Sequence, residues 1–134
     1  LIASSGWFID LTDSGSKIGE KGLSSPVVLA GKLFFTTFVP GISDPCQASE
    51  GSGRLYGIDA INASALFEDW LAGGDDTKLE TGDRTFALGG GIPSSAVPIF
   101  QKQGVTLLIG TGGGARSVDP DIDLPRVRTY WYEE

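Results

Sequence analysis

The sequence predicts an all-β protein built from antiparallel strand meanders. Three observations favour this fold class: short runs rich in β-branched and aromatic residues, glycine or proline between the runs, and brief turn segments joining neighbouring runs. The 134 residues include 20 Gly and 7 Pro, and 40% of them are hydrophobic, which is enough for a packed core. We therefore expect one folded domain or a piece of one.

The predicted strands follow one another along the chain as separate short runs. They are Trp7 to Leu11, Pro26 to Ala30, Leu33 to Val39, Arg54 to Asp59, Ala96 to Phe100, Val105 to Thr111 and Val127 to Tyr132. Hairpin turns are expected at Ala30-Gly31-Lys32 and at Lys102-Gln103-Gly104. Between residues 60 and 71 the apolar spacing favours a helix, whereas Asn62 and Ser64 favour a turn, and both interpretations stay open.

Two segments, residues 22–37 and 91–112, repeat one pattern of Ser-Ser pair, apolar strand, tight turn and second apolar strand. The pairs begin at Ser24 and Ser94, a spacing longer than the roughly 40–50 residues of a propeller repeat. We therefore expect a first unit at 1–71, an inserted acidic, glycine-rich loop at 72–90 and a second unit at 91–134. Because such a meander cannot bury its inner face alone, the predicted architecture is about two blades of a β-propeller.

Composition excludes several classes of function. The chain has no histidine, so it cannot by itself build a Ser-His-Asp or Cys-His catalytic arrangement or an imidazole metal site. The net charge of −7 offers no basic patch for a nucleic-acid backbone, and nucleic acid is not an expected partner. The longest apolar runs are too short to span a bilayer.

Three alternating carboxylates form the one weak candidate for a metal site. Asp119, Asp121 and Asp123 are spaced like the first ligands of a calcium-binding EF-hand loop. However, Leu124 stands where that loop requires glycine, and Tyr130 stands where it requires a bidentate glutamate. We therefore favour a solvated acidic turn and expect no cofactor, with calcium as the weaker alternative.

Other polar and glycine-rich motifs have structural interpretations. The run Gly110 to Gly114 follows a strand but precedes no helix that would complete a dinucleotide site, so we expect a turn or β-bulge there. The run Gly89 to Gly91 has the same interpretation. Asp10 and Asp59 end predicted strands, where an aspartate usually accepts a hydrogen bond from a turn amide.

The single cysteine and the tryptophans complete the set of candidate residues. Cys46 has no partner within the chain and no neighbouring group to activate its thiol, so we expect a disulfide to a segment outside this sequence. Trp7 and Trp131 lie in strand-like runs and are expected in the core. Trp70, beside the acidic loop, is the candidate contact residue.

Several of these segments together carry a family resemblance. Residues 23–37 followed by 53–60 resemble a blade of the quinoprotein-type β-propeller. More narrowly, the segments Gly6-Trp-Phe-Ile-Asp-Leu, Phe35-Thr-Thr-Phe, Ser43-Asp-Pro-Cys, Gly53-Arg-Leu-Tyr-Gly-Ile-Asp-Ala and Arg128-Thr-Tyr-Trp-Tyr-Glu resemble, in this order, the end of PilY-type type IV pilus biogenesis proteins.

The resemblance implies a non-enzymatic part of a large surface protein, extracellular or associated with the outer membrane. Its carboxy-terminal propeller would help pilus extension and retraction and contact host surfaces. The implied partners are the remainder of the parent propeller and pilus or host proteins, and open sheet edges predict that the isolated segment self-associates. The family often has a calcium-binding, Asp-rich loop, which has no clear counterpart here. The alternatives are a fragment of a quinone-dependent dehydrogenase-type propeller and a carbohydrate-binding module.

Overall fold

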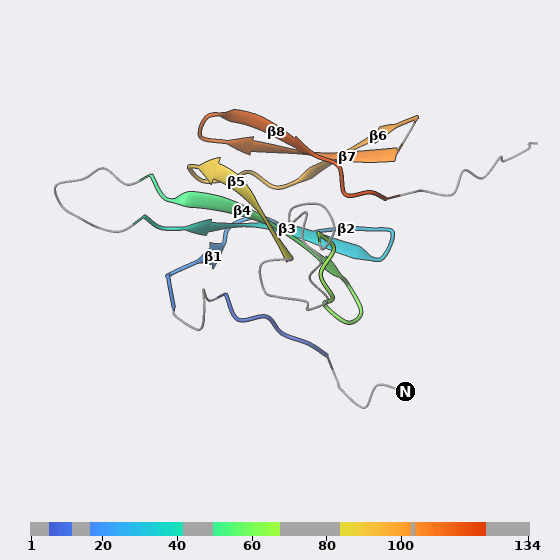
Figure 1. Ribbon diagram of the computed structural model, residues 1–134, viewed down its shortest axis with the longest axis horizontal. Coiled ribbons are helices and arrows are strands. Elements are labelled where there is room, and N and C mark those ends of the chain that lie inside the picture. The colour runs from blue at the N-terminus through green and yellow to red at the C-terminus, as the bar shows by residue number, and fades with distance from the viewer. Residues whose placement is uncertain (1–5, 12–16, 42–49, 68–83, 103, 123–134) are drawn as a thin grey trace, which may run out of the picture.

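The structure is a computed structural model that describes residues 6–11, 17–41, 50–67, 84–102 and 104–122. Within these ranges the chain forms eight β-strands in two antiparallel sheets, one lying above the other in Figure 1. The predicted all-β, antiparallel fold class is therefore confirmed. Among the described residues no helix has the length and apolar character needed to cross a membrane.

The first sheet is formed by residues from the amino-terminal two thirds of the chain. Its strands are β1 (Lys21–Gly22), β2 (Val27–Leu29), β3 (Lys32–Val39), β4 (Ser52–Asp59) and β5 (Thr85–Gly90), in the order β1-β3-β4-β5 with β2 also pairing with β3. β3 and β4 pair along their full lengths, from Lys32 with Asp59 to Val39 with Ser52. The β2–β3 turn has φ angles of 49° at Ala30 and 77° at Gly31, so this hairpin occurs where the sequence predicts it.

The second sheet is a three-stranded meander. It consists of β6 (Val97–Gln101), β7 (Gly104–Thr111) and β8 (Gly114–Val118), with β7 in the centre. The β6–β7 hairpin confirms the second predicted turn, and a further hairpin joins β7 to β8. Because successive side chains of a strand point to opposite faces, Leu107 and Ile109 lie on one face and Leu108 lies on the other.

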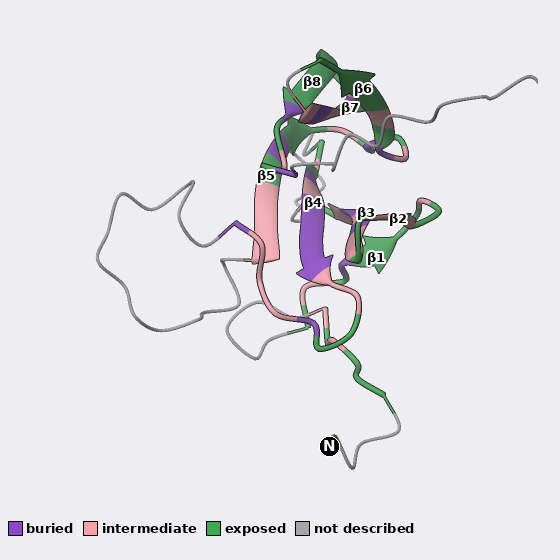
Figure 2. Ribbon diagram, turned by 90° about the vertical axis from the view of Figure 1, so that its right-hand side faces the viewer, coloured by how far each residue is buried: buried purple, intermediate pink, exposed green. Residues whose placement is uncertain are grey.

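The two sheets pack face to face and share one hydrophobic core. Its buried members are Phe34, Leu55, Phe67, Leu88, Ala96, Leu107, Ile109, Val118 and Ile122. Five of them, two from the first sheet and three from the second, are completely inaccessible to solvent. Figure 2 shows β4 as a mostly buried strand, whereas β6 and β8 are largely exposed. The core therefore lies between the sheets, and the far side of the second sheet faces solvent.

The internal repeat of the sequence is also a repeat of local structure. Ser24 Oγ accepts a hydrogen bond of 3.0 Å from the backbone N–H of Thr36, and Ser94 Oγ accepts one of 2.9 Å from that of Gly110. In both cases the serine precedes the first hairpin strand and satisfies an amide of the second strand beyond the last paired residue. The first serine of each Ser-Ser pair therefore has the same role in the two units.

A hydroxyl group links the two units directly. Thr36 is fully buried, and its Oγ1 donates a hydrogen bond of 2.9 Å to the backbone carbonyl of Ser94. The same Oγ1 lies 2.7 Å from Ser24 Oγ. A chain of hydrogen bonds therefore connects the serine of the first unit, through β3, to the start of the second unit.

The prediction of a first strand at Trp7 to Leu11 is wrong. Residues 7–11 form no strand, and Trp7 is 38% exposed instead of buried in the core. Its indole Nε1 donates a hydrogen bond of 3.1 Å to the carbonyl of Ala60. The segment therefore contacts the turn after β4 through the indole N–H of Trp7, and the indole ring stays partly exposed to water.

Three strands, β1, β5 and β8, were not predicted, and one ambiguous segment is resolved in part. β5 occupies the last residues of the stretch 72–90 that was expected as a loop, and β8 follows the glycine-rich run after β7. Residues 60–67 form no helix: residues 60–62 are a turn and Ala65 makes an isolated bridge with Ile58, which agrees with the turn interpretation. Residues 68–71 of that segment, Trp131 and the strand predicted at 127–132 lie outside the described residues.

Candidate functional site

A buried carboxylate is fastened to the face of the first sheet that points away from the second sheet. The Glu20 side chain has no exposed area. Its Oε1 accepts hydrogen bonds from Thr37 Oγ1 at 2.5 Å and from the Tyr56 hydroxyl at 3.0 Å. Its Oε2 accepts one of 3.1 Å from Arg54 Nη1, which forms an ion pair with it. Three side chains from β3 and β4 thus bind one carboxylate just before β1.

Sheet register brings these groups together. Thr37 of β3 is directly opposite Arg54 of β4, and Tyr56 lies two residues further along the same face of β4. Phe35, opposite Tyr56, stacks its ring on the phenol with centroids 4.8 Å apart. Sequence reasoning missed this cluster because Glu20 is far from these strands in the chain. The only sequence clue was the shared strand face of Thr37, Arg54 and Tyr56.

The Tyr56 phenol keeps its proton at all ordinary pH values. Burial, followed by the charge of Glu20 and its hydrogen bond, raises the pKa of Tyr56 from 10.0 to about 12. Tyr56 therefore remains a hydrogen-bond donor to the carboxylate. Among the described residues no buried side-chain nitrogen or oxygen lacks a hydrogen-bond partner. The cluster is thus saturated by its own members, and it holds the chain before β1 against the sheet.

The predicted acidic turn adopts a compact local structure. Asp119 Oδ1 accepts a hydrogen bond of 2.9 Å from the backbone N–H of Asp121, and Asp121 has a φ of 48°. This arrangement uses one carboxylate to stabilise the turn itself. Asp123 lies outside the described residues, and within the described part no group of three His, Cys, Asp or Glu side chains is placed to hold a metal ion. The calcium alternative stays a prediction.

Asp59 stabilises the turn that follows β4. Its Oδ1 accepts hydrogen bonds from the backbone amides of Ile61 at 2.9 Å and Asn62 at 3.3 Å. These two bonds lower the pKa of the Asp59 carboxyl group, because they favour its charged form. This confirms the expected turn role. Asp10 is exposed, and Trp70 and Cys46 lie outside the described residues.

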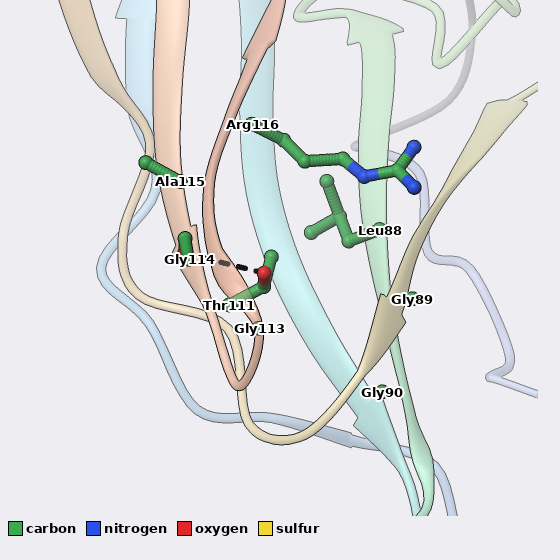
Figure 3. A pocket seen from close by; sticks show the side chains of 8 residues that line it. All are labelled: Leu88, Gly89, Gly90, Thr111, Gly113, Gly114, Ala115 and Arg116. Atoms are coloured by element: carbon green, nitrogen blue, oxygen red, sulfur yellow. Dashed lines mark hydrogen bonds between the residues drawn. The ribbon is translucent and has the colours of Figure 1, made fainter.

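The glycine-rich runs form turns and a bulge beside a small open cavity. The run after β7 closes the β7–β8 hairpin at Thr111 and Gly114, as expected for a turn. The β4–β5 register shifts so that Leu88 is an extra residue, which confirms a bulge next to Gly89. Figure 3 shows the cavity, of about 260 Å³, between these segments, with the Arg116 side chain extending over it. Four of its eight lining residues are glycines.

The outer face of the second sheet has an apolar surface. We define this surface by three side chains that share one face through the β6–β7 register: Val97, Ile99 and Leu108. They are 54%, 39% and 38% exposed. Sequence reasoning missed this surface because the alternation of a strand does not say which face the rest of the molecule will cover.

The comparisons with known proteins give one match. Over 65 residues, 48% of this chain, the sequence is 40% identical to a protein of Xylella fastidiosa described as a type IV pilus biogenesis factor PilY1 homolog. The chain spans about 4% of the length of that relative. No protein-family profile matches the chain, and no solved structure matches it.

This similarity supports a PilY-type pilus biogenesis relationship. The structure thus defines an all-β domain of two packed antiparallel sheets, and about half of its sequence is similar to that of a type IV pilus biogenesis factor PilY1 homolog.

Proposed function

We propose that this chain is a non-enzymatic scaffold segment of a type IV pilus biogenesis protein and that it acts through protein contacts at the cell surface. In this proposal the two sheets are adjoining blades of a β-propeller, and pilus or host proteins are the partners. The 40% identity to the PilY1 homolog carries the proposal. The all-β fold and the repeated serine geometry of the two units are compatible with it.

The arrangement of the described polar groups supports a role in scaffolding. Glu20, whose side chain is fully buried, is bound by three donors of its own chain and holds the segment before β1 in place. The bound side chains thus maintain the shape of the first sheet. A scaffold needs such fixed surfaces, because its contacts depend on the positions of exposed side chains.

The test is genetic and is done in the bacterium that encodes this sequence. We expect an in-frame deletion of the segment to reduce surface pili, measured as pilin sheared from cells, while total cellular pilin stays constant. A copy of the intact gene should restore the surface pilin. Normal piliation and normal twitching motility in the deletion strain would overturn the proposal.

A second measurement separates the scaffold from the alternative functions. The intact protein is mixed with pyrroloquinoline quinone and calcium, and separately applied to a glycan array. We expect no absorbance of bound quinone and no specific glycan signal. A bound quinone would favour the dehydrogenase-type alternative, and glycan binding would favour the carbohydrate-binding module.

A further inference from the structure

The apolar surface of Val97, Ile99 and Leu108 has a partly buried counterpart in the first unit. In the first hairpin Val27 pairs with Phe34, and in the second Val97 pairs with Leu108. The serine contacts extend the same correspondence, because each serine lies three residues before the valine and binds the residue two positions after its partner.

The correspondence assigns each exposed residue a partner in the first unit. Val27 corresponds to Val97, Leu29 corresponds to Ile99, and Phe34 corresponds to Leu108. Val27, Leu29 and Phe34 lie on the face of the first sheet that meets the second sheet. Phe34 is completely buried in the shared core, and Leu29 packs against that core.

The packing of the two units is therefore directional. The first unit packs with the face that carries Phe34. The second unit packs with its other face, which carries Leu107 and Ile109, and not with the face that corresponds to that of Phe34. A head-to-tail contact of this type leaves the second unit with a free copy of the first face. In this chain the free copy is the outer surface of Val97, Ile99 and Leu108.

We propose that this outer surface is the docking surface for a third β-meander of the same repeat, supplied by a longer polypeptide. The proposal rests on the proposed scaffold function and names the surface through which the scaffold continues. The incoming sheet must present bulky aliphatic side chains at the positions that correspond to Leu107, Ile109 and Val118. The length of the PilY1 homolog, of which this chain spans about 4%, provides room for further units.

A second copy of this chain does not fit the same role. To dock on the outer surface, the second copy would have to use the face of its first sheet that carries Leu33, Phe35 and Ile58. These residues occupy the positions that Leu107, Ile109 and Val118 occupy in the second unit. Ile58 is completely buried within its own chain, and the neighbouring Tyr56 is 2% exposed and bound to Glu20. Leu33 and Phe35 are half-buried, so much of that face is already covered by its own chain.

The new interface differs from the existing one in one polar contact. In the first unit Thr36 donates its hydroxyl to the carbonyl of Ser94 across the interface. The corresponding residue of the second unit is Gly110, which has no side chain to donate. Gly110 therefore offers no hydrogen bond to the third meander. The carbonyl of the third meander that corresponds to that of Ser94 needs another donor or a water molecule.

Site-specific photo-cross-linking in the full-length protein tests the proposal. Leu108 is replaced by p-benzoylphenylalanine, and a second variant has the same replacement at Val97 in case the first does not fold. The control position is Ile61, which is 75% exposed in the turn after β4. Irradiated protein is digested, and the cross-linked peptides are identified by mass spectrometry.

We expect an intramolecular cross-link from position 108 or 97 to a strand-like, aliphatic peptide outside the 134 residues. Its yield should exceed that at position 61 by an order of magnitude. A cross-link to another molecule, a cross-link within the 134 residues, or a yield equal to the control would each overturn the proposal. These outcomes are independent of the pilus assay, so failure of the docking surface is distinguishable from failure of the proposed function.

Discussion

Removal of the buried Glu20 carboxylate should destabilise the fold strongly. Glu20→Ala leaves the Thr37 and Tyr56 hydroxyls buried without their acceptor. A hydrogen bond to a charged group contributes about 1.5 kcal/mol or more, so the two lost bonds amount to about 3 kcal/mol. The third bond adds little, because the Arg54 side chain is 26% exposed and water can solvate it.

A graded series separates the carboxylate from the volume of the side chain. Glu20→Gln retains the shape and one acceptor oxygen, so we expect a smaller loss of about 1–2 kcal/mol. Tyr56→Phe removes a single donor and should also cost about 1–2 kcal/mol. Combined with Glu20→Ala, Tyr56→Phe should add little, because its partner is already absent.

Urea unfolding followed by tryptophan fluorescence measures these free energies, and Glu50→Ala serves as the control because Glu50 is exposed. The reasoning is refuted if Glu20→Ala stays within about 0.5 kcal/mol of the unchanged protein, the range of ordinary surface substitutions. Full additivity of Glu20→Ala and Tyr56→Phe would also contradict the proposed cluster.

Three further predictions concern the core, one close backbone contact and the pH dependence. Phe34→Ala should cost about 3–5 kcal/mol in urea unfolding, whereas Phe100→Ala, at a 62% exposed position, should change stability little; equal effects would contradict the shared core. Gly91 has a φ of 85°, and a Cβ there would lie 2.8 Å from Gly112 Cα, so Gly91→Ala should lower the melting temperature. Gly113→Ala, with open space around its Cβ, should not, and similar melting temperatures would argue against the contact. Because the pKa of Tyr56 is raised from 10.0 to about 12, its unfolded form loses the phenol proton first, and stability should fall as the pH rises from 10 to 12. Tyr56→Phe should weaken this fall in pH-dependent urea unfolding, and an unchanged profile would rule out Tyr56 as its source.

The proposed docking surface has a consequence for the isolated chain. Val97, Ile99 and Leu108 are then exposed without their partner sheet, and exposed apolar side chains favour association. Self-association of the isolated segment stays a prediction, and this surface adds less specific apolar contacts to those that the edges of the two sheets offer.

The sequence determined the central strands and their hairpins. β3, β4 and β7 contain several Phe, Leu, Ile, Tyr, Val and Thr residues, whose β-propensity favours strands. The Ala30-Gly31 turn was also predictable, because its positive φ angles suit glycine. The internal repeat was visible as two Ser-Ser pairs, and the structure adds the hydrogen bonds that explain them.

Only the tertiary structure decided the peripheral strands and the buried polar cluster. β5 and β8 contain glycine, alanine and polar residues, and they form because a neighbouring strand supplies hydrogen-bond partners. Trp7 shows the reverse, since an apolar run formed no strand and bonded Ala60 through its indole. Local composition sets the preference of a segment for the β conformation, but contacts between distant residues decide which preferences are used. The placement of Glu20 between Thr37 and Tyr56 is such a contact.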